Sequence, residues 1–413
     1  MRNRPDELKI RKDLKEKLTA GIDYSREISD DEMKELIDGL LTGEGKRIPL
    51  SLSEKEKLRK ELFFAVRKLD VLQELVDDTQ ITEIMINGPE HIFIEKKGRL
   101  SRLEQKFESK EKLEDVIQQI VAACNRVVNE ASPMVDARLE NGARVNVVLS
   151  PVALNGPIVT IRRFPDKPIA MEDLLTFGSV TREVCGFLQK LVKAKYNIFI
   201  SGGTGSGKTT FLNALSNYIP EDERIITIED SAELQILNIP NLVRMETRNA
   251  NVEGCQEITI RDLIKTSLRM RPDRIIVGEV RGGEAFDMMQ CLNTGHDGSM
   301  STGHANSSKD MLNRLENMIL MGMDLPLNAI RQQIASGIDI IIHLGRLRDK
   351  SRKVLEIVEV LGFEAGEILL KPLYSFTETG EDEDGKVSGI LKKKGELTYV
   401  EKLKSAGLYS GIG

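Results

Sequence analysis

The sequence predicts an α/β protein in which a mostly parallel sheet carries helices on both faces. A glycine-rich loop at residues 202–209 lies between an apolar strand-like run and a helix-like run. Strand-like and helix-like segments alternate after residue 168, which is typical of a parallel sheet. Before residue 165 the pattern differs, because a two-residue alternation there predicts a smaller α+β domain with a mostly antiparallel sheet.

The composition indicates a folded protein of more than one domain. The chain has 413 residues, of which 40% are hydrophobic and 30% charged. No apolar run approaches the roughly 18 residues of a membrane span, and the first residues lack the apolar core of a secretory signal, so we expect a cytoplasmic protein. The net charge of −6 disfavours nonspecific binding of nucleic acid. The four cysteines form no C-x-x-C pair, which argues against a disulfide framework or a zinc site.

The chain divides into four expected segments. They are a helical segment at 1–55, the α+β domain at 56–165, the larger α/β domain at 166–376 and a tail at 377–413 that forms a loose hairpin or is disordered. Serines followed three residues later by glutamate predict helix starts at Ser29 and Ser53. A proline-containing run at 164–168 predicts the hinge between the two domains.

Strands are expected in both domains. In the smaller domain we place them at 83–86, 92–95, 135–139, 143–149 and 157–164, with helices at 53–69 and 113–128. In the larger domain we place them at 196–200, 224–229, 242–246, 274–278, 299–302, 339–344, 354–361 and 368–373.

The glycine-rich loop predicts a phosphate-binding site, because it fits G-x-x-x-x-G-K-[ST] between a strand and a helix. Small residues let successive backbone N–H groups point at phosphate oxygens, and the helix that follows adds its positive end. Lys208 would reach the terminal phosphates and the Thr209 hydroxyl would bind Mg²⁺. The expected nucleotide-binding residues are Gly202, Gly203, Thr204, Gly205, Ser206, Gly207, Lys208, Thr209 and Thr210.

Two acidic residues follow predicted strands, at the edge of the sheet where ligands bind in such folds. Glu229 ends one strand and Glu279 follows another, in the manner of a Walker B acid. Gly278 occupies the place where many enzymes with this loop have aspartate, so Mg²⁺ would rely on Thr209, phosphates and waters, with Glu279 behind them. Glu229 is favoured as the base that orients the attacking water and Glu279 as the acid on the metal side, although the sequence does not separate the two roles.

A histidine-containing stretch at 294–306 forms the third candidate cluster. It holds His296 and His304, two of the four histidines in the chain. These two histidines bring no further ligands at metal-binding spacing, so a metal site is disfavoured. A polar contact to the terminal phosphate is the functional interpretation, with His304 as the sensing residue, and a purely structural histidine is the alternative.

These boxes together resemble the type II/IV secretion and pilus-assembly ATPases. The resemblance rests on four segments: the glycine-rich (Walker A) loop, Glu229-Asp230, the run from Leu268 to Ala285 and the histidine-containing stretch. They look most similar to the CpaF-type ATPase of Tad/Flp pilus systems and less closely to type IV secretion ATPases. The tetracysteine zinc module of many type II secretion members is absent.

The resemblance implies a RecA-like ATPase domain after a PAS-like α+β domain, and a homo-hexameric ring. It implies ATP and Mg²⁺ as substrate and cofactor, and an inner-membrane platform protein as partner on the cytoplasmic face. Arginines of the first domain that reach the phosphates would be Arg144, Arg162 and Arg163. Arg244 and Arg248 are further candidates.

Two other functions stay open from the sequence. A nucleic-acid translocase would need a basic channel lined with aromatic residues, which a chain without tryptophan and with 4% aromatic residues supports poorly. A scaffold that binds nucleotide without hydrolysing it is disfavoured by the presence of Lys208, Glu229 and Glu279.

Overall fold

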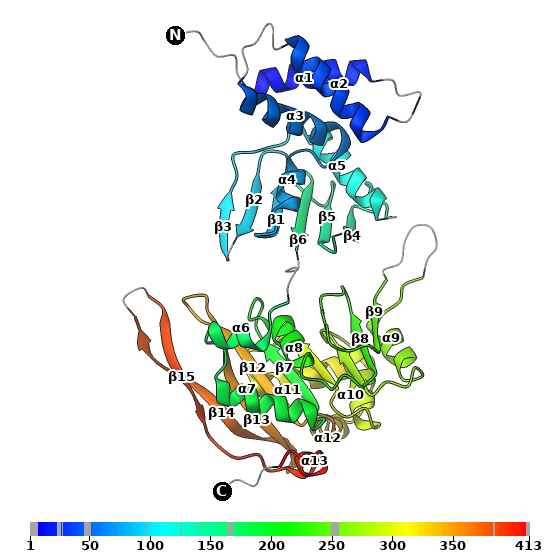
Figure 1. Cartoon of the computed structure of the whole chain (residues 1–413). Coiled ribbons are helices and arrows are strands. Elements are labelled where there is room, and N and C mark those ends of the chain that lie inside the picture. The colour runs from blue at the N-terminus through cyan, green and yellow to red at the C-terminus, as the bar shows by residue number, and fades with distance from the viewer. Residues whose placement is uncertain are drawn as a thin grey trace. The chain divides into compact units, whose positions relative to one another are not determined.

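The computed structural model describes residues 7–22, 26, 28–44, 51–96, 98–124, 126–139, 141–163, 168–248, 256–382 and 385–409. The chain forms two compact units, residues 1–166 and 167–413 (Figure 1). Apart from Pro168, the predicted hinge lies outside the described residues. None of the helices in the described part of the chain is both long and apolar enough to span a membrane.

The first unit begins with three helices around a small apolar core. They are α1 (Glu7–Gly21), α2 (Asp30–Glu44) and α3 (Leu52–Arg67). The capping box at Ser29 is confirmed, because the backbone N–H of Glu32 donates to Ser29 Oγ at 3.2 Å and that of Ser29 donates to Glu32 Oε2 at 3.0 Å. The box at Ser53 is wrong: the cap of α3 lies two residues earlier, at Ser51, with Glu54 as the reciprocal acid. Both serines precede a glutamate by three residues, so the motif alone did not choose between them.

The rest of the first unit is an antiparallel sheet covered by helices on one face. Its elements are α4 (Val71–Asp77), β1 (Ile81–Asn87), β2 (Ile92–Lys96), β3 (Arg99–Arg102), α5 (Lys110–Ala123), β4 (Met134–Arg138), β5 (Arg144–Val148) and β6 (Ile158–Arg162). The strand order is β3-β2-β1-β6-β5-β4, and every pairing is antiparallel, as predicted. The predicted helix to residue 128 is too long, since α5 ends at Ala123 and Val128 packs into the core from the loop beyond.

The second unit is built on a nine-stranded sheet. Its elements are α6 (Met171–Thr176), α7 (Arg182–Lys193), β7 (Ile198–Gly202), α8 (Lys208–Ser216), β8 (Ile225–Glu229), β9 (Leu242–Glu246), α9 (Ile260–Ser267), β10 (Arg274–Val277), α10 (Glu284–Asn293), β11 (Met300–Gly303), α11 (Ser308–Gly322), α12 (Leu327–Gly337), β12 (Ile340–Arg346), β13 (Arg352–Glu364), β14 (Glu367–Glu381), β15 (Val387–Lys393) and α13 (Glu401–Ser405). The strand order is β15-β14-β13-β12-β7-β11-β10-β8-β9.

Six of these strands, from β12 to β9 in the sheet order, are parallel, as predicted. Helices α7 and α8 pack on one face and α9 to α12 on the other (Figure 1). The expectation of a parallel sheet is wrong for the strands predicted at 354–361 and 368–373, because β13 and β14 run antiparallel to their neighbours. β15, in the segment predicted to be a loose hairpin or disordered, also pairs antiparallel, with β14. Short turns join these strands, and a short turn can only reverse the chain into an antiparallel neighbour.

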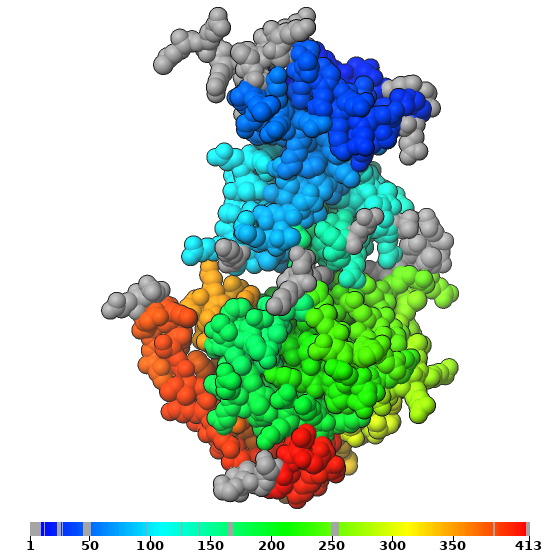
Figure 2. Space-filling model, viewed as in Figure 1, coloured from blue at the N-terminus to red at the C-terminus, as the bar shows by residue number. Residues whose placement is uncertain are grey.

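The tail is part of this unit where the structure describes it. β14 runs on to Glu381 and forms a hairpin with β15. The carboxylate of Glu359, which is 2% exposed, accepts hydrogen bonds from the backbone N–H groups of Thr398 and Tyr399. The Lys402 ammonium lies 2.8 Å from a carboxylate oxygen of Asp339. These contacts fasten the last helix to the second unit, where Figure 2 shows it in red.

Candidate functional site

Parallel strands bring the predicted chemical residues to one edge of the second unit's sheet. β7, β11, β10 and β8 lie side by side in that order. Their carboxyl ends lead into the glycine loop, His304, Glu279 and Glu229 respectively. The carboxyl edge of an open α/β sheet is where such folds bind ligands.

The glycine loop is shaped by residues without side chains. Gly205 and Gly207 have φ of 72° and 92°, in the left-handed region that favours glycine. A Cβ on Gly202 would lie 2.5 Å from the carbonyl oxygen of Leu344, so the loop packs against β12 with no space for a larger residue. α8 begins at Lys208, directly after the loop. The first N–H groups of α8 therefore join those of the loop in a concave set of donors for an anion.

Lys208, His304 and Glu279 form one continuous line of contacts. The Lys208 side chain is 7% exposed, and its Nζ lies 3.2 Å from His304 Nδ1 and 3.3 Å from the carbonyl oxygen of Gly203. On the other side of the ring, His304 Nε2 lies 2.8 Å from Glu279 Oε1. Segments that follow three different strands thus bring a carboxylate, an imidazole and an ammonium group into contact.

Burial of the ring, helped by two nearby cations, favours a neutral histidine. Burial lowers the pKa of His304, and the cations Lys208 and Arg281 act in the same direction against Glu279. Because an ammonium group can only donate, Nδ1 accepts from Lys208 and the ring proton lies on Nε2, facing the carboxylate. Burial also lowers the pKa of Lys208, which Glu279 opposes.

Arg281 links two acidic residues that follow different strands, Glu279 after β10 and Asp230 after β8. Its Nη2 donates to Glu279 Oε2 at 2.7 Å, and its Nη1 lies 3.5 Å from Asp230 Oδ2. The bond to Glu279 raises the pKa of Arg281. Glu279 is therefore oriented from both sides, by a guanidinium and by an imidazole.

Glu229 is buried and holds a turn. Its carboxylate is 3% exposed, and Oε1 accepts hydrogen bonds of 2.9 Å from the backbone N–H groups of Glu233 and Leu234. Its Oε2 is buried with no hydrogen-bond partner among the described residues. Burial raises the pKa of Glu229 to about 7, although the two backbone bonds oppose the shift.

The unexpected glycine at position 278 follows from this arrangement. The backbone N–H of Gly278 donates to Ile228, so the two strand ends are in register. A Cβ on Gly278 would lie 2.9 Å from Cγ of Glu229. Glu229 occupies the space that an aspartate at 278 would need.

Comparison with known proteins places this site in a family. A family model described as type II/IV secretion system protein matches residues 66–382, well over half of the chain. The chain belongs to this family. It is 33% identical over 293 residues to the putative conjugal transfer protein Rv3659c of Mycobacterium tuberculosis, which covers 70% of this chain and 83% of the relative. It is 32% identical over 330 residues to the type IV secretion system protein VirB11 of Bartonella henselae, covering 70% of this chain and 91% of that one.

Two solved structures share the fold of this type II/IV secretion family member. The ATPase DotB of Legionella pneumophila has a TM-score of 0.51 at 20% identity and covers 70% of this chain and 79% of its own. The pilus retraction motor PilT with bound ADP has a TM-score of 0.51 at 18% identity and covers 74% and 81%. The second unit is accordingly a RecA-like domain.

His296 does not join the others. It precedes β11, and its Nδ1 lies 3.3 Å from the carbonyl oxygen of Cys291. Because His304 follows the same strand, the two histidines lie at opposite ends of β11, His296 at its amino end and His304 at its carboxyl end. The expected contact of His296 with nucleotide therefore finds no support in the geometry of one chain.

The three arginines predicted in the first unit differ in their partners, which are carboxylates for two of them and backbone carbonyls for the third. Arg144 and Arg162 are neighbours across β5 and β6. Nη2 of Arg144 lies 3.4 Å from Oδ1 of Asp136, and Nε of Arg162 lies 2.8 Å from Oε1 of Glu83. Arg163 faces inward instead, donating to the carbonyls of Val76 and Asp78.

Arg244 and Arg248, the further candidates from the sequence, lie at the end of the second unit's sheet that β9 forms. Arg244 is exposed on β9, and Arg248, also exposed, follows that strand and donates to the carbonyl of Gln256 at 3.2 Å. Arg244 therefore belongs to β9, the strand at the end of the sheet order farthest from β15, and Arg248 lies just beyond it.

The sequence missed residues that β12 and β13 bring to the loop. His343, which is 7% exposed, lies 2.8 Å through Nδ1 from Oγ of Ser201, directly before the loop. Burial lowers the pKa of His343. Arg352 donates to the carbonyl of Gly205. A histidine inside a fully apolar strand was the only signal available for the first, and nothing in the local sequence pointed to the second.

Oxygen ligands for Mg²⁺ are present at the loop. Thr209 is half-buried in the first turn of α8, and Glu279 follows β10, which β11 separates from β7 in the sheet. Within the described residues, no group of three or more histidine, cysteine, aspartate or glutamate side chains could hold an ion. Mg²⁺ commonly binds through one or two protein oxygens plus phosphates and waters, so this donor set fits it.

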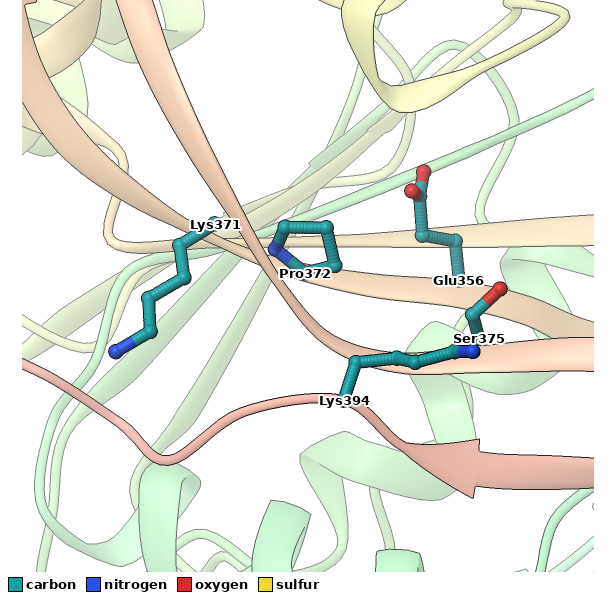
Figure 3. Close-up of a pocket in the computed structure, with 5 residues that line it drawn as sticks. All are labelled: Glu356, Lys371, Pro372, Ser375 and Lys394. Atoms are coloured by element: carbon teal, nitrogen blue, oxygen red, sulfur yellow. The ribbon is translucent and has the colours of Figure 1, made fainter.

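A separate hollow lies on the antiparallel part of the sheet. It has a volume of about 330 Å³ and is lined by Glu356, Lys371, Pro372, Ser375 and Lys394 (Figure 3). Glu356 accepts a hydrogen bond of 2.7 Å from Ser308 Oγ, at the start of α11. None of the residues predicted for the nucleotide site lines this hollow.

Proposed function

We propose that the chain is a Mg²⁺-dependent ATPase that hydrolyses ATP to ADP and phosphate at the glycine loop. The observation that carries this proposal is the line of contacts from Lys208 through His304 to Glu279, at the open end of the loop. It unites a cation for phosphate, a neutral ring and a carboxylate within reach of one bound group. The expected nucleotide-binding residues from Gly202 to Thr210 would hold the phosphates.

The proposed chemistry is charge stabilisation and positioning, as in other phosphoryl transfers. Lys208 would exchange His304 and the Gly203 carbonyl for the terminal phosphates. Thr209 would bind Mg²⁺ and Glu279 would lie behind the waters of the ion, which neutralises phosphate charge when bound. His304, neutral and next to Lys208, would then report whether that lysine is engaged.

The geometry favours Glu279 over Glu229 as the carboxylate that orients the attacking water. Each of the two acids has one buried oxygen without a hydrogen bond among the described residues, but Glu279 also contacts His304 and Arg281, whereas the other oxygen of Glu229 is committed to the turn at 233–234. We therefore assign Glu229 the positioning of that turn. Comparison of Glu279→Gln with Glu229→Gln tests the assignment: the first should lose at least about 100-fold in kcat and the second much less. Equal losses would contradict it.

We further propose that six chains form a ring in which the first unit closes over the nucleotide. Arg144 and Arg162, which are cross-strand neighbours, support this, because a guanidinium fork matches phosphate oxygens. Arg163 is held by backbone carbonyls and would support the sheet instead. The first unit would have the PAS-like fold. An ATPase rate per chain that climbs with protein concentration would support a site completed between neighbours, and a constant rate from a sample shown to be monomeric would contradict it.

The task we propose for this motor is to power pilus assembly of the Tad/Flp type, or protein secretion, through an inner-membrane platform protein on the cytoplasmic face. The family match and the fold shared with a pilus retraction motor support it. Deletion of the gene, complemented with wild type or with Lys208→Ala, provides the test. Loss of surface pili or of secreted protein with both the deletion and the variant is the expected result.

A second candidate is the transfer of DNA or protein by a type IV secretion system. It is favoured by relatives named for conjugal transfer and by VirB11. Tight binding of single-stranded DNA that weakens steeply with salt would favour it, and its absence would favour the pilus or protein substrate. A scaffold without turnover would bind ATP but show no hydrolysis under any condition.

A further inference from the structure

The hairpin of β12 and β13 lies beside the glycine loop, on the side opposite β11. β12 pairs with β7 in parallel, and Leu344 aligns with Gly202, the last residue of β7. Two residues further on, Arg346 pairs with Arg352 across the hairpin. The sheet therefore delivers two arginines of the same chain to the side of the loop.

Both arginine side chains reach the loop. Nε of Arg352 donates to the carbonyl of Gly205 at 2.9 Å, and its Cδ lies 3.3 Å from where a Cβ on Gly207 would be. Nη1 of Arg346 lies 3.6 Å from where a Cβ on Gly205 would be. These are the two loop residues with left-handed backbone, so the arginines contact the part of the loop with the most specific shape.

Among the described residues, no carboxylate compensates the charge of these two arginines. Of the other cations in the hairpin, Arg348 pairs with Glu378 and Glu381, and Lys353 donates to the carbonyl of Gly178. Arg346 and Arg352 make no ion pair with any of the residues that the structure describes, and both are exposed. Two unpaired guanidinium groups next to a concave set of N–H donors attract an anion.

We propose that Arg346 is a further catalytic residue, which contacts the terminal phosphates of the nucleotide from within the same chain, and that Arg352 is a positioning residue that holds the tip of the loop. The inference rests on the proposed ATPase function and adds to it a source of positive charge outside the first unit. Charge spreads over the phosphate oxygens in the transition state, so a guanidinium at this place accelerates hydrolysis. Because the β7–β12 ladder fixes it, this arginine needs no neighbouring chain.

The test compares Arg346→Gln and Arg352→Gln with Arg348→Gln. The control sits on the same hairpin, but its guanidinium faces Glu378 and Glu381. Binding of ADP and of a non-hydrolysable ATP analogue is measured by titration, beside steady-state hydrolysis of Mg²⁺-ATP. Arg346→Gln should lower kcat at least about tenfold and weaken the ATP analogue more than ADP. Arg352→Gln should weaken both nucleotides alike, with recovery in Arg352→Lys, and Arg348→Gln should stay within about twofold of wild type.

Three outcomes decide the matter. Wild-type hydrolysis with Arg346→Gln indistinguishable from Arg348→Gln would overturn the inference and leave the ATPase proposal intact. Failure of the wild-type protein to bind either nucleotide would overturn the proposed function and this inference with it. Unequal melting temperatures would show a folding defect, in which case recovery of kcat by Arg346→Lys supports the role of the charge and a failure to recover refutes it.

Discussion

The ammonium nitrogen of Lys208 lies 3.2 Å from Nδ1 of His304, the residue that follows the neighbouring strand. The lysine is thereby held away from solvent by a ring that is itself oriented by Glu279. A bound phosphate would compete with the ring for the same ammonium group. Nucleotide binding would therefore break this contact and free His304, which lies in the segment that leads into α11.

Replacement of His304 by alanine should lower kcat by at least about tenfold while nucleotide affinity changes little. The reason is that the variant leaves the glycine loop and Lys208 in place but removes the link to Glu279. Steady-state hydrolysis and nucleotide titration measure the two effects. His296→Ala is the matched control, because that histidine stands at the opposite edge of the sheet; an equal loss in both variants would refute the role of the contact.

Substitution of Gly278 by alanine should destabilise the protein by about 1–3 kcal/mol. The new Cβ would meet Cγ of Glu229 at 2.9 Å. Denaturant unfolding gives the change in the free energy of unfolding. In a Glu229→Ala background the same substitution should cost much less, since the opposing atoms are gone. A cost that does not depend on residue 229 would show that the clash lies elsewhere.

The stability of the second unit should depend on pH through Glu229. Burial raises the pKa of this carboxyl from 4.5 in the ordinary case to about 7. The folded state then binds the proton more tightly than the unfolded chain, so its contribution to stability is greatest below pH 4.5 and is lost as the pH rises to about 7. At roughly 1.4 kcal/mol for each pKa unit, the loss is about 3 kcal/mol.

Glu229→Gln removes this titration and keeps an oxygen for the backbone N–H groups of the turn. Relative to wild type, the variant should therefore gain stability between pH 5 and pH 8, as measured by the melting temperature at each pH. Glu221→Gln, at an exposed position, serves as the control. A difference between Glu229→Gln and wild type that stays constant over this range is the contrary result.

The buried ion pair of Arg274 and Glu223, at the amino ends of β10 and β8, should contribute strongly to the stability of the fold. The guanidinium is 0% exposed and donates two hydrogen bonds, of 2.6 and 2.7 Å, to the carboxylate. Glu223→Ala leaves the buried guanidinium of Arg274 without its counter-charge, with only the carbonyls of Val192 and Gly298 as acceptors, and should cost about 3–5 kcal/mol of unfolding free energy. Asp222→Ala, at the exposed neighbouring position, provides the comparison. A cost below about 1 kcal/mol in Glu223→Ala would contradict the expectation.

Much of this architecture was accessible from the sequence because its signals are local. The loop from Gly202 to Thr209 needs glycines at fixed places, and apolar runs mark the buried parallel strands on both sides of it. Parallel strands then dictate that residues following them share an edge. This reasoning correctly brought Lys208, Glu279 and His304 together.

The remainder depends on contacts between distant segments. Arg346 and Arg352 lie near the loop only because β12 pairs with β7, and no pattern around residue 350 reveals that pairing. The burial of Glu229 against Gly278 is likewise a packing relation between two strand ends. His296 and His304 are close in the sequence, but β11 runs between them and places them at opposite ends of the strand.

The most direct measurement of the central claim is the rate of Mg²⁺-ATP hydrolysis by the wild-type chain and by Lys208→Ala, purified and assayed side by side. The account expects turnover by the wild type that falls to background in the variant, with both proteins equally folded. Turnover that survives the loss of Lys208 would place the chemistry outside the glycine loop and contradict the account.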